Sequence, residues 1–221
     1  IRMQRYDYNS DDVKNFREEI KKYIVPLNSK LIEKQAERIG VEALMYYDLK
    51  YEFPDGNAEP CGNSEELKKV ALNMYNDLSP ECSELFNMMY EADLLDLESR
   101  NGKIQGGYCT SLPDYKVPFV FANFNKTSDD VETLTHEVGH ALNDYLTRNF
   151  DLFLQNDLSY ETAEIHSTSM EYFTLPYMDK FFGKDADKYR FSHLSGTLSF
   201  MAYEACVDEF QHIIYSNPDM T

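Results

Sequence analysis

The spacing of apolar residues predicts helices through most of residues 1–98. The first apolar stripe recurs every three or four positions, at Val13, Phe16, Ile20 and Ile24. We expect Ser10 or Asp11 to cap this long helix, because both side chains can accept a hydrogen bond from a free backbone N–H. Pro26 should bend the helix, and Gly40 should end it.

Two shorter helices complete this N-terminal part. Ser64 precedes the helical run EELKKVALNMYNDL and is expected to cap it. Ser79 and Pro80 are typical of a helix start, and we expect the helix that they open to continue through ECSELFNMMYEADLLDL. We interpret residues 1–98 as a helical scaffold.

Residues 99–126 break the helical pattern. They include the stretch RNGKIQGGYCTSLPDYKVPFVFANFN, which is rich in glycine, proline and aromatic residues. Its apolar run from Val117 to Phe121 suits a strand. We therefore expect a small β-hairpin or sheet immediately before the next helix.

Helical periodicity returns over residues 127–221. Thr127 or Ser128 should cap a helix that runs to about Asn149. A second helix is expected through ETAEIHSTSMEYF, stopping before the next proline, and a long helical tract from about Asp185 to Tyr215. The predicted fold class is mostly α, as a single mostly helical region with one small β element.

Composition places the chain among globular proteins and limits its partners. Its 221 residues are 43% hydrophobic and 14% aromatic, enough to bury a core as one large domain or two small ones. The formal net charge of −18 repels polyanions, so neither nucleic acid nor an anionic membrane surface is expected as a partner. No apolar run approaches the roughly 18 residues that a membrane span needs.

The cysteines indicate a reducing compartment. They are scattered without a C-x-x-C pair, at Cys61, Cys82, Cys109 and Cys206. A chain of this length does not need disulfides to stabilise its core. Because the start IRMQRYDY is also unlike a signal peptide, we expect a cytoplasmic protein.

The candidate chemistry lies in the sequence THEVGH. His136 and His140 are four residues apart, so on a helix they lie one turn apart and both imidazoles can reach one metal ion. Glu137 lies further round the helix, better placed to hold a water than to bind the metal. In the H-E-x-x-H pattern the histidines bind Zn²⁺ and the glutamate is the general base. A partly buried pair of structural histidines would give the same spacing.

A zinc site makes further demands that the sequence meets. The third ligand should come from another element, and Glu164 lies 24 residues after His140, which leaves room for the chain to turn and return. Gly139 would let that element approach closely, despite a helix-propensity cost of roughly 1 kcal/mol. An apolar stripe anchors the metal helix at Val131, Leu134, Val138 and Leu142.

The second predicted helix carries several candidate residues. Four share one face by the 3.6-residue period: Glu161, Glu164, Thr168 and Glu171. Glu171 is either a candidate to orient a ligand histidine through its free ring N–H or an ordinary surface charge, whereas Glu161 is interpreted as a surface charge. His166 is expected to point away from Glu164. The histidines without a metal role are interpreted as structural or surface residues: His166, His193 and His212.

Four segments of the chain form a specific series. In order they are GGYCTSLPDYKVPFVFANFN, DVETLTHEVGHAL, AEIHSTSMEYF and AYEACVDEFQHIIYSNP, with a weaker match over RYDYNSDDVKNF and YIVPL. In this combination the chain resembles the M3 family of zinc metallopeptidases, specifically its oligoendopeptidase F branch. Residues 1–221 resemble the zincin-like catalytic core of a larger peptidase.

The resemblance implies an intracellular endopeptidase that cuts short, unfolded peptides in a deep, mostly helical channel. It assigns one Zn²⁺ per chain to His136, His140 and Glu164, and the role of general base to Glu137. It also implies that GGYCTSLPDYKVPFVFANF lies near the metal, where an edge strand can pair with an extended peptide backbone.

The resemblance also indicates what this chain lacks. In the family, a helical segment beyond the match to VDEFQHIIYSNP carries a His and a Tyr that polarise the scissile carbonyl. A long N-terminal helical region precedes the matched part. We therefore expect an excised catalytic core with reduced or no activity.

Two other functions remain open from the sequence. A metallocarboxypeptidase with the same motif would need a cationic anchor for the substrate carboxylate, and no Lys or Arg lies among the motif residues. A zinc-binding or peptide-binding domain without turnover would have no use for Glu137 beside an open metal position.

Overall fold

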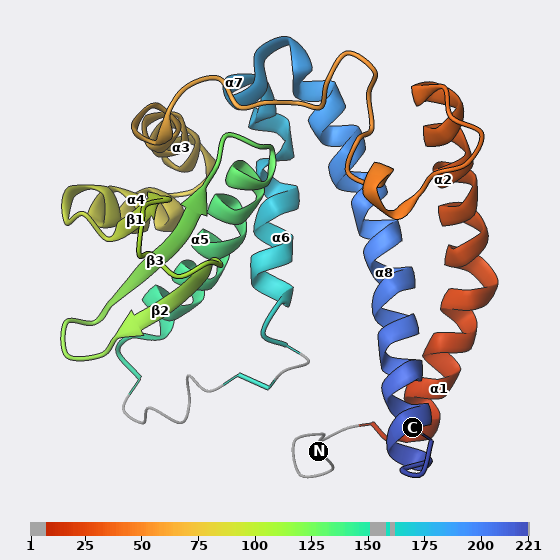
Figure 1. Cartoon of the computed structure of the whole chain (residues 1–221). Coiled ribbons are helices and arrows are strands. Elements are labelled where there is room, and N and C mark those ends of the chain that lie inside the picture. The colour runs from red at the N-terminus through yellow and green to blue at the C-terminus, as the bar shows by residue number, and fades with distance from the viewer. Residues whose placement is uncertain (1–7, 151–157, 160–161, 221) are drawn as a thin grey trace. The chain divides into compact units, whose positions relative to one another are not determined.

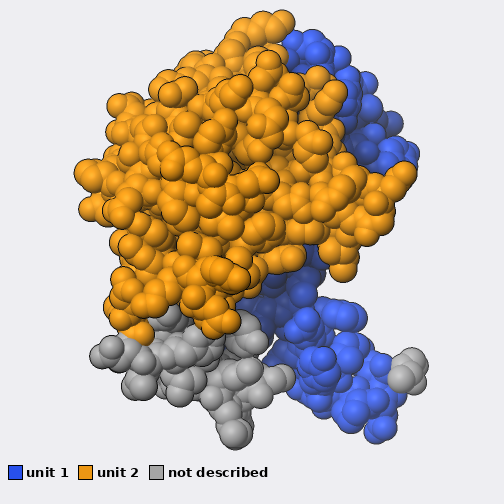
Figure 2. Space-filling view, turned by 90° about the vertical axis from the view of Figure 1, so that its left-hand side faces the viewer, with its two compact units in different colours: residues 1–57, 188–221 blue, residues 58–187 orange. Residues whose placement is uncertain are grey.

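The computed structural model describes residues 8–150, 158–159 and 162–220 (Figure 1). The chain divides into two compact units, one of Ile1–Asn57 with Lys188–Thr221 and the other of Ala58–Asp187 (Figure 2). Helices dominate the described residues, which also form one three-stranded sheet. The predicted fold class, mostly α with a small β element, is confirmed. In the described ranges, no helix is both long enough and apolar enough to cross a membrane.

The first unit is built from long helices. They are α1 (Ser10–Glu19), the π-helical turn η2 (Ile20–Ile24), α2 (Val25–Ile39), the 3₁₀ turn η3 (Tyr46–Asp48) and α8 (Ala186–Ser216), whose first two residues belong to the second unit. α1 and α8 lie side by side (Figure 1), joined by an ion pair between the buried Arg17 and Asp208. A second ion pair lies next to it, with Lys21 Nζ 2.6 Å from Glu209 Oε1. These pairs hold together two distant segments of the chain.

The cap of α1 differs from the prediction. Asn9, rather than Ser10 or Asp11, is the capping residue, and its Oδ1 accepts the N–H of Asp11 at 2.8 Å. The Asp12 carboxylate accepts the N–H of Asn9 at 2.9 Å in return. This reciprocal capping box satisfies more free backbone donors than a single side chain at Ser10 or Asp11 would.

The interruption near Pro26 takes the form of a π-helical turn. The backbone N–H of Val25 donates to the carbonyl of Ile20, five residues back, and Pro26 has no N–H with which to continue the regular pattern. The helix then runs on to Ile39. Gly40 ends it as predicted, with φ at 79°, a left-handed conformation that glycine adopts without steric cost.

The second unit packs helices around a buried core. They are α3 (Ser64–Leu78), α4 (Pro80–Glu91), α5 (Asp129–Thr147), α6 (Ile165–Thr174) and α7 (Met178–Phe182), with 3₁₀ turns at Leu175–Tyr177 and Gly183–Asp185. α3 is capped by Asn63 rather than the predicted Ser64. Asn63 Oδ1 accepts the N–H of Glu66 at 3.0 Å, and the Glu66 carboxylate accepts the N–H of Asn63 at 2.9 Å.

The predicted helix through residue 97 is wrong in its last part. α4 ends at Glu91, and Asp93 adopts a left-handed conformation with φ at 55°, which redirects the chain. Leu95–Glu98 then forms strand β1, in which Leu95 and Leu97 are buried while Asp96 and Glu98 are less buried. The apolar run fits either period, and pairing with a neighbouring strand decides for the strand.

The sheet has the strand order β1, β3, β2. β3 (Val117–Phe124) pairs in parallel with β1 and antiparallel with β2 (Tyr108–Leu112), with Tyr108 opposite Phe121 and Leu112 opposite Val117. The predicted hairpin is therefore β2 with β3, extended by a third strand. β2 lies at an edge of the sheet beside α5 (Figure 1).

The remaining helix boundaries agree with the pattern to within a few residues. α5 ends two residues before the predicted Asn149, and α8 matches its predicted tract to within one residue at each end. Ser128 precedes α5 as predicted but makes no capping hydrogen bond with its side chain. α6 begins only at Ile165, so Glu164 lies just before its first turn. Glu161 lies outside the described residues.

Candidate metal centre

α5 and α6 approach each other closely at Gly139. A Cβ atom placed on Gly139 would lie 2.5 Å from Ser167 Cα and 2.8 Å from the carbonyl oxygen of His166. Real Cβ atoms do not approach backbone atoms so closely, so only glycine permits this crossing. The expected close approach at Gly139 is confirmed, and it brings the start of α6 against the histidine face of α5.

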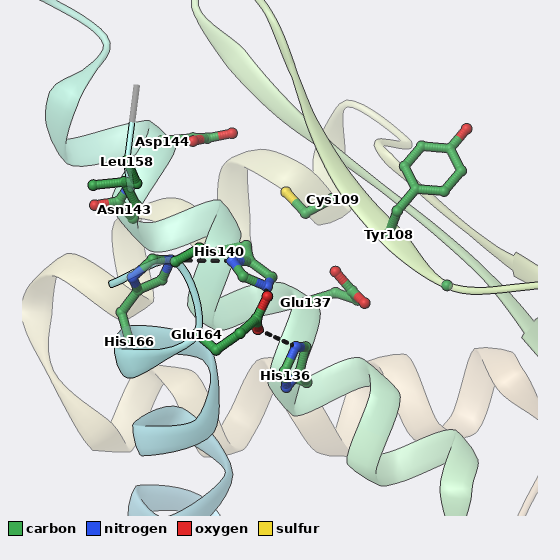
Figure 3. A pocket seen from close by; sticks show the side chains of 12 residues that line it. Tyr108, Cys109, His136, Glu137, His140, Asn143, Asp144, Leu158, Glu164 and His166 are labelled. Atoms are coloured by element: carbon green, nitrogen blue, oxygen red, sulfur yellow. Dashed lines mark hydrogen bonds and ion pairs between the residues drawn. The ribbon is translucent and has the colours of Figure 1, made fainter. Parts of the chain in front are cut away.

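Three side chains from these elements converge on one point (Figure 3). His136 Nε2 lies 3.0 Å from Glu164 Oε2, and His140 Nε2 lies 3.2 Å from the same oxygen. Two ligands that each bind a tetrahedral Zn²⁺ at about 2.0–2.2 Å are roughly 3.3 Å apart, so the separations fit. The donor set, two imidazoles and one carboxylate, is also one that Zn²⁺ prefers.

Glu164 reaches this point from the residue that precedes α6. Its side chain is 61% exposed, and Ser167 Oγ donates a hydrogen bond to its Oε2 at 2.7 Å. Although partial burial alone would raise the pKa of Glu164, the Ser167 hydrogen bond and the nearby histidines outweigh it, and the pKa is lowered. The predicted shared helical face is wrong for Glu164, because α6 has not yet begun there.

His136 is held from behind by Glu171, which lies inside α6. His136 Nδ1 is 2.6 Å from Glu171 Oε1, and the Glu171 side chain is only 10% exposed. Burial by itself would lower the pKa of His136, but the Glu171 hydrogen bond and the surrounding carboxylates raise it. The structure thus places Glu171 against the ring nitrogen that faces away from Glu164.

His140 is held from behind by His166. His140 Nδ1 lies 3.0 Å from His166 Nε2, and the two rings meet edge to face with centroids 5.0 Å apart (Figure 3). The prediction that His166 points away from the site is wrong, because its ring contacts His140. It assumed a helix that already included Glu164, whereas the first turn of α6 starts afterwards and turns His166 toward α5.

Glu137 faces the edge strand β2 rather than Glu164. It is 7% exposed, and its carboxylate accepts the backbone N–H of Cys109. Burial, followed by the charge of Glu164, raises the pKa of Glu137 above its ordinary value, against the opposing effect of His136. A raised pKa brings a carboxylate closer to the range in which it can both take up and release a proton near neutral pH.

A cavity of about 390 Å³ opens in front of these residues. Its lining includes the side chains of His136, Glu137, His140 and Glu164, together with Tyr108, Cys109, Asn143 and Asp144. No Lys or Arg contributes to the described lining. Burial raises the pKa of the Asp144 carboxyl and of the Cys109 thiol. The sequence pattern gave no reason to choose Asp144, although it lies one turn after His140 on the same helix.

Comparison with known proteins gives a family match over the whole chain. Peptidase family M3 matches residues 1–221. An oligoendopeptidase F homolog of Lactococcus lactis subsp. lactis (strain IL1403) is 30% identical over 147 residues, which are 66% of this chain and 24% of that protein. The match therefore covers about a quarter of the length of that relative.

Solved structures agree with the computed fold. A Bacillus anthracis (strain Ames) protein that carries the name oligoendopeptidase F superposes with a TM-score of 0.96 at 50% identity, over 100% of this chain and 40% of that one. PZ peptidase A, solved with an inhibitor, superposes with a TM-score of 0.95 at 49% identity, over 98% of this chain and 39% of that one.

Proposed function

Because the chain belongs to peptidase family M3, we propose that it is the catalytic core of a zinc-dependent endopeptidase that hydrolyses short oligopeptides. The observation that carries this proposal is the convergence of His136 Nε2, His140 Nε2 and Glu164 Oε2, with the buried carboxylate of Glu137 beside them. A site of this kind leaves one metal position open for water, as hydrolysis requires.

His136, His140 and Glu164 would hold one Zn²⁺ per chain. When bound, the ion supplies Lewis-acid chemistry, polarising the peptide carbonyl and lowering the pKa of a water. Glu171 would keep the His136 imidazole turned toward it. Glutamate is charged at neutral pH, as a metal ligand must be, and the lowered pKa of Glu164 extends the charged form to more acidic pH.

Glu137 would act as the general base. Its carboxylate takes a proton from the attacking water and later delivers it to the amine that leaves. The Cys109 N–H holds the carboxylate toward the cavity, and the raised pKa suits a group that must carry the proton between the two steps.

The substrate would be an extended peptide bound along the free edge of β2. Edge strands present unpaired backbone groups, and β2 lies beside Glu137. The relatives are named as oligoendopeptidases, which supports short peptides as substrates. All four cysteines are free thiols, which supports a reducing, cytosolic setting.

The alternatives find less support. A carboxypeptidase needs a cation for the terminal carboxylate, and the described cavity lining carries none. In a zinc-binding domain without turnover, Glu137 would be a buried carboxylate with a raised pKa and no role in the chemistry of the site.

The test compares the wild-type chain with Glu137→Gln, using Glu91→Gln as a control on the exposed end of α4. Zinc content is measured on each purified protein, together with cleavage of a quenched fluorescent oligopeptide. We expect about one zinc per chain in all three, and a loss of cleavage on the order of 10²–10⁴-fold in Glu137→Gln alone. No zinc after reconstitution, or cleavage by Glu137→Gln as fast as by a wild-type chain that cleaves the peptide, would overturn the proposal.

A further inference from the structure

The two candidate ligand histidines are supported by chemically different groups. Behind His136 lies a carboxylate, Glu171, whereas behind His140 lies another imidazole, that of His166. Resting on the function proposed above, we infer that His166 is a positioning residue that fixes the ring orientation and tautomer of His140 for zinc.

The direction of the hydrogen bond follows from the two nitrogens of His140. Its Nε2 faces Glu164 Oε2 and must present a lone pair to a metal, so the proton of a neutral ring resides on Nδ1. That Nδ1–H donates to Nε2 of His166 at 3.0 Å. His166 must then be neutral at Nε2 and carry its own proton on Nδ1.

The backbone around His166 fixes the position of this contact. The carbonyl oxygen of His166 lies at the crossing of α5 and α6, where only the missing side chain of Gly139 allows it to fit. Glu164 and His166 therefore enter the site from the same short segment, and Ser167 binds Glu164 from that segment too. One tight helix crossing positions a ligand and the support of another ligand together.

A neutral support also suits the charge of the site. Glu137, Glu164 and Glu171 already place three carboxylates around two histidines in a partly buried region. A fourth carboxylate behind His140 would add a like charge, whose repulsion raises the energy of the ionised forms. An imidazole accepts the hydrogen bond without adding charge.

The experiment measures zinc affinity at a fixed pH of about 7.5 by competition with a chromophoric chelator, which does not depend on turnover. The variants are His166→Ala, which removes the acceptor, and His166→Gln, whose side-chain oxygen reaches the place of Nε2. His212→Ala, at an exposed position of α8, makes the same chemical change away from the site. The thermal midpoint of each protein with and without zinc accompanies the affinity, because zinc binding to the folded form raises it.

We expect His166→Ala to weaken zinc binding by about 10–100-fold, as is typical when a partner of a metal ligand is removed. His166→Gln should recover most of this loss, and His212→Ala should bind like the wild type. Zinc affinity of His166→Ala within twofold of the wild type, or no recovery in a folded His166→Gln, overturns the inference while leaving the proposed function standing. A wild-type chain that binds no zinc would overturn both.

Discussion

The Nδ1 atom of His136 lies 2.6 Å from Oε1 of Glu171, a residue 35 positions later in the chain. Because the Glu171 side chain is nearly buried, it can hold the imidazole in one orientation with little competition from water. We predict that Glu171→Ala weakens zinc binding by about 10–100-fold and that Glu171→Gln, which keeps an acceptor oxygen, weakens it less.

Chelator competition on the purified variants measures this effect. If Glu171→Ala bound zinc as tightly as the wild type, Glu171 would have no role in holding the metal ligand. A larger loss in Glu171→Gln than in Glu171→Ala would show that the carboxylate acts by another route.

Gly139→Ala should destabilise the protein although alanine is the better helix former. The new Cβ would lie 2.5 Å from Ser167 Cα, so α5 and α6 must separate, at a cost of about 1–3 kcal/mol. Gly196→Ala in α8 is the matched control, because a Cβ there meets no described atom within 4 Å. That substitution should stabilise by up to about 1 kcal/mol.

Urea unfolding of the zinc-free proteins measures both free energies, and zinc titration should show weaker binding in Gly139→Ala alone. Opposite signs of the two stability changes are the expected outcome. A stabilised Gly139→Ala would mean that the helix crossing is less tight than its geometry indicates.

Asp96 should contribute a stability that depends on acid pH. Arg100 and Lys103 bind its carboxylate, and the Arg100 hydrogen bond is the larger cause that lowers its pKa from 3.8 to about 2. A depressed pKa means that the folded protein favours the charged form, so this stability is present above pH 4 and is lost as the pH falls toward 2.

We expect Asp96→Asn to lower the free energy of unfolding by about 1 kcal/mol at pH 7, after allowance for solvent screening of a partly exposed group. The difference from the wild type should shrink steadily between pH 4 and pH 2. Denaturant unfolding across this range measures it, and a difference that is constant with pH would contradict the assignment to charge.

The cavity should favour peptides with a basic side chain. Asp144 adds a carboxylate two turns beyond Glu137 on α5, about 10 Å further along the helix, or roughly three residues of an extended peptide. With no Lys or Arg in the described lining, its charge has no cationic partner there. A cationic side chain near that position should gain about 1 kcal/mol, or roughly fivefold in affinity.

Binding of fluorescent peptides to zinc-loaded Glu137→Gln measures this preference without turnover. A set with one arginine, leucine or glutamate at successive positions should show arginine bound best at one position. Asp144→Asn should abolish that preference and leave the leucine peptide unaffected. A preference that survives Asp144→Asn would assign it to other groups.

The sequence predicted correctly those features that depend on one helix alone. The spacing of His136 and His140 is enough to place both rings on one face, because a helix has 3.6 residues per turn whatever surrounds it. The end of α2 at Gly40 and the extent of α8 follow from equally local preferences. Glu171 was predicted from a helical face shared with Glu164; α6 starts only after Glu164, but Glu171 lies within α6 and contacts His136.

The parts that the sequence left open depend on packing between segments. The run Leu94–Leu97 fits a helix or a strand, and only pairing with β3 makes it β1. Glu164 reaches the histidines from outside α6, and His166 reaches His140, because the helix starts at Ile165 and crosses α5 at Gly139. By itself the sequence determined which residues of α5 share a helix face. The tertiary structure decided which faces meet, because a contact across two elements depends on their start and crossing, which no local periodicity encodes.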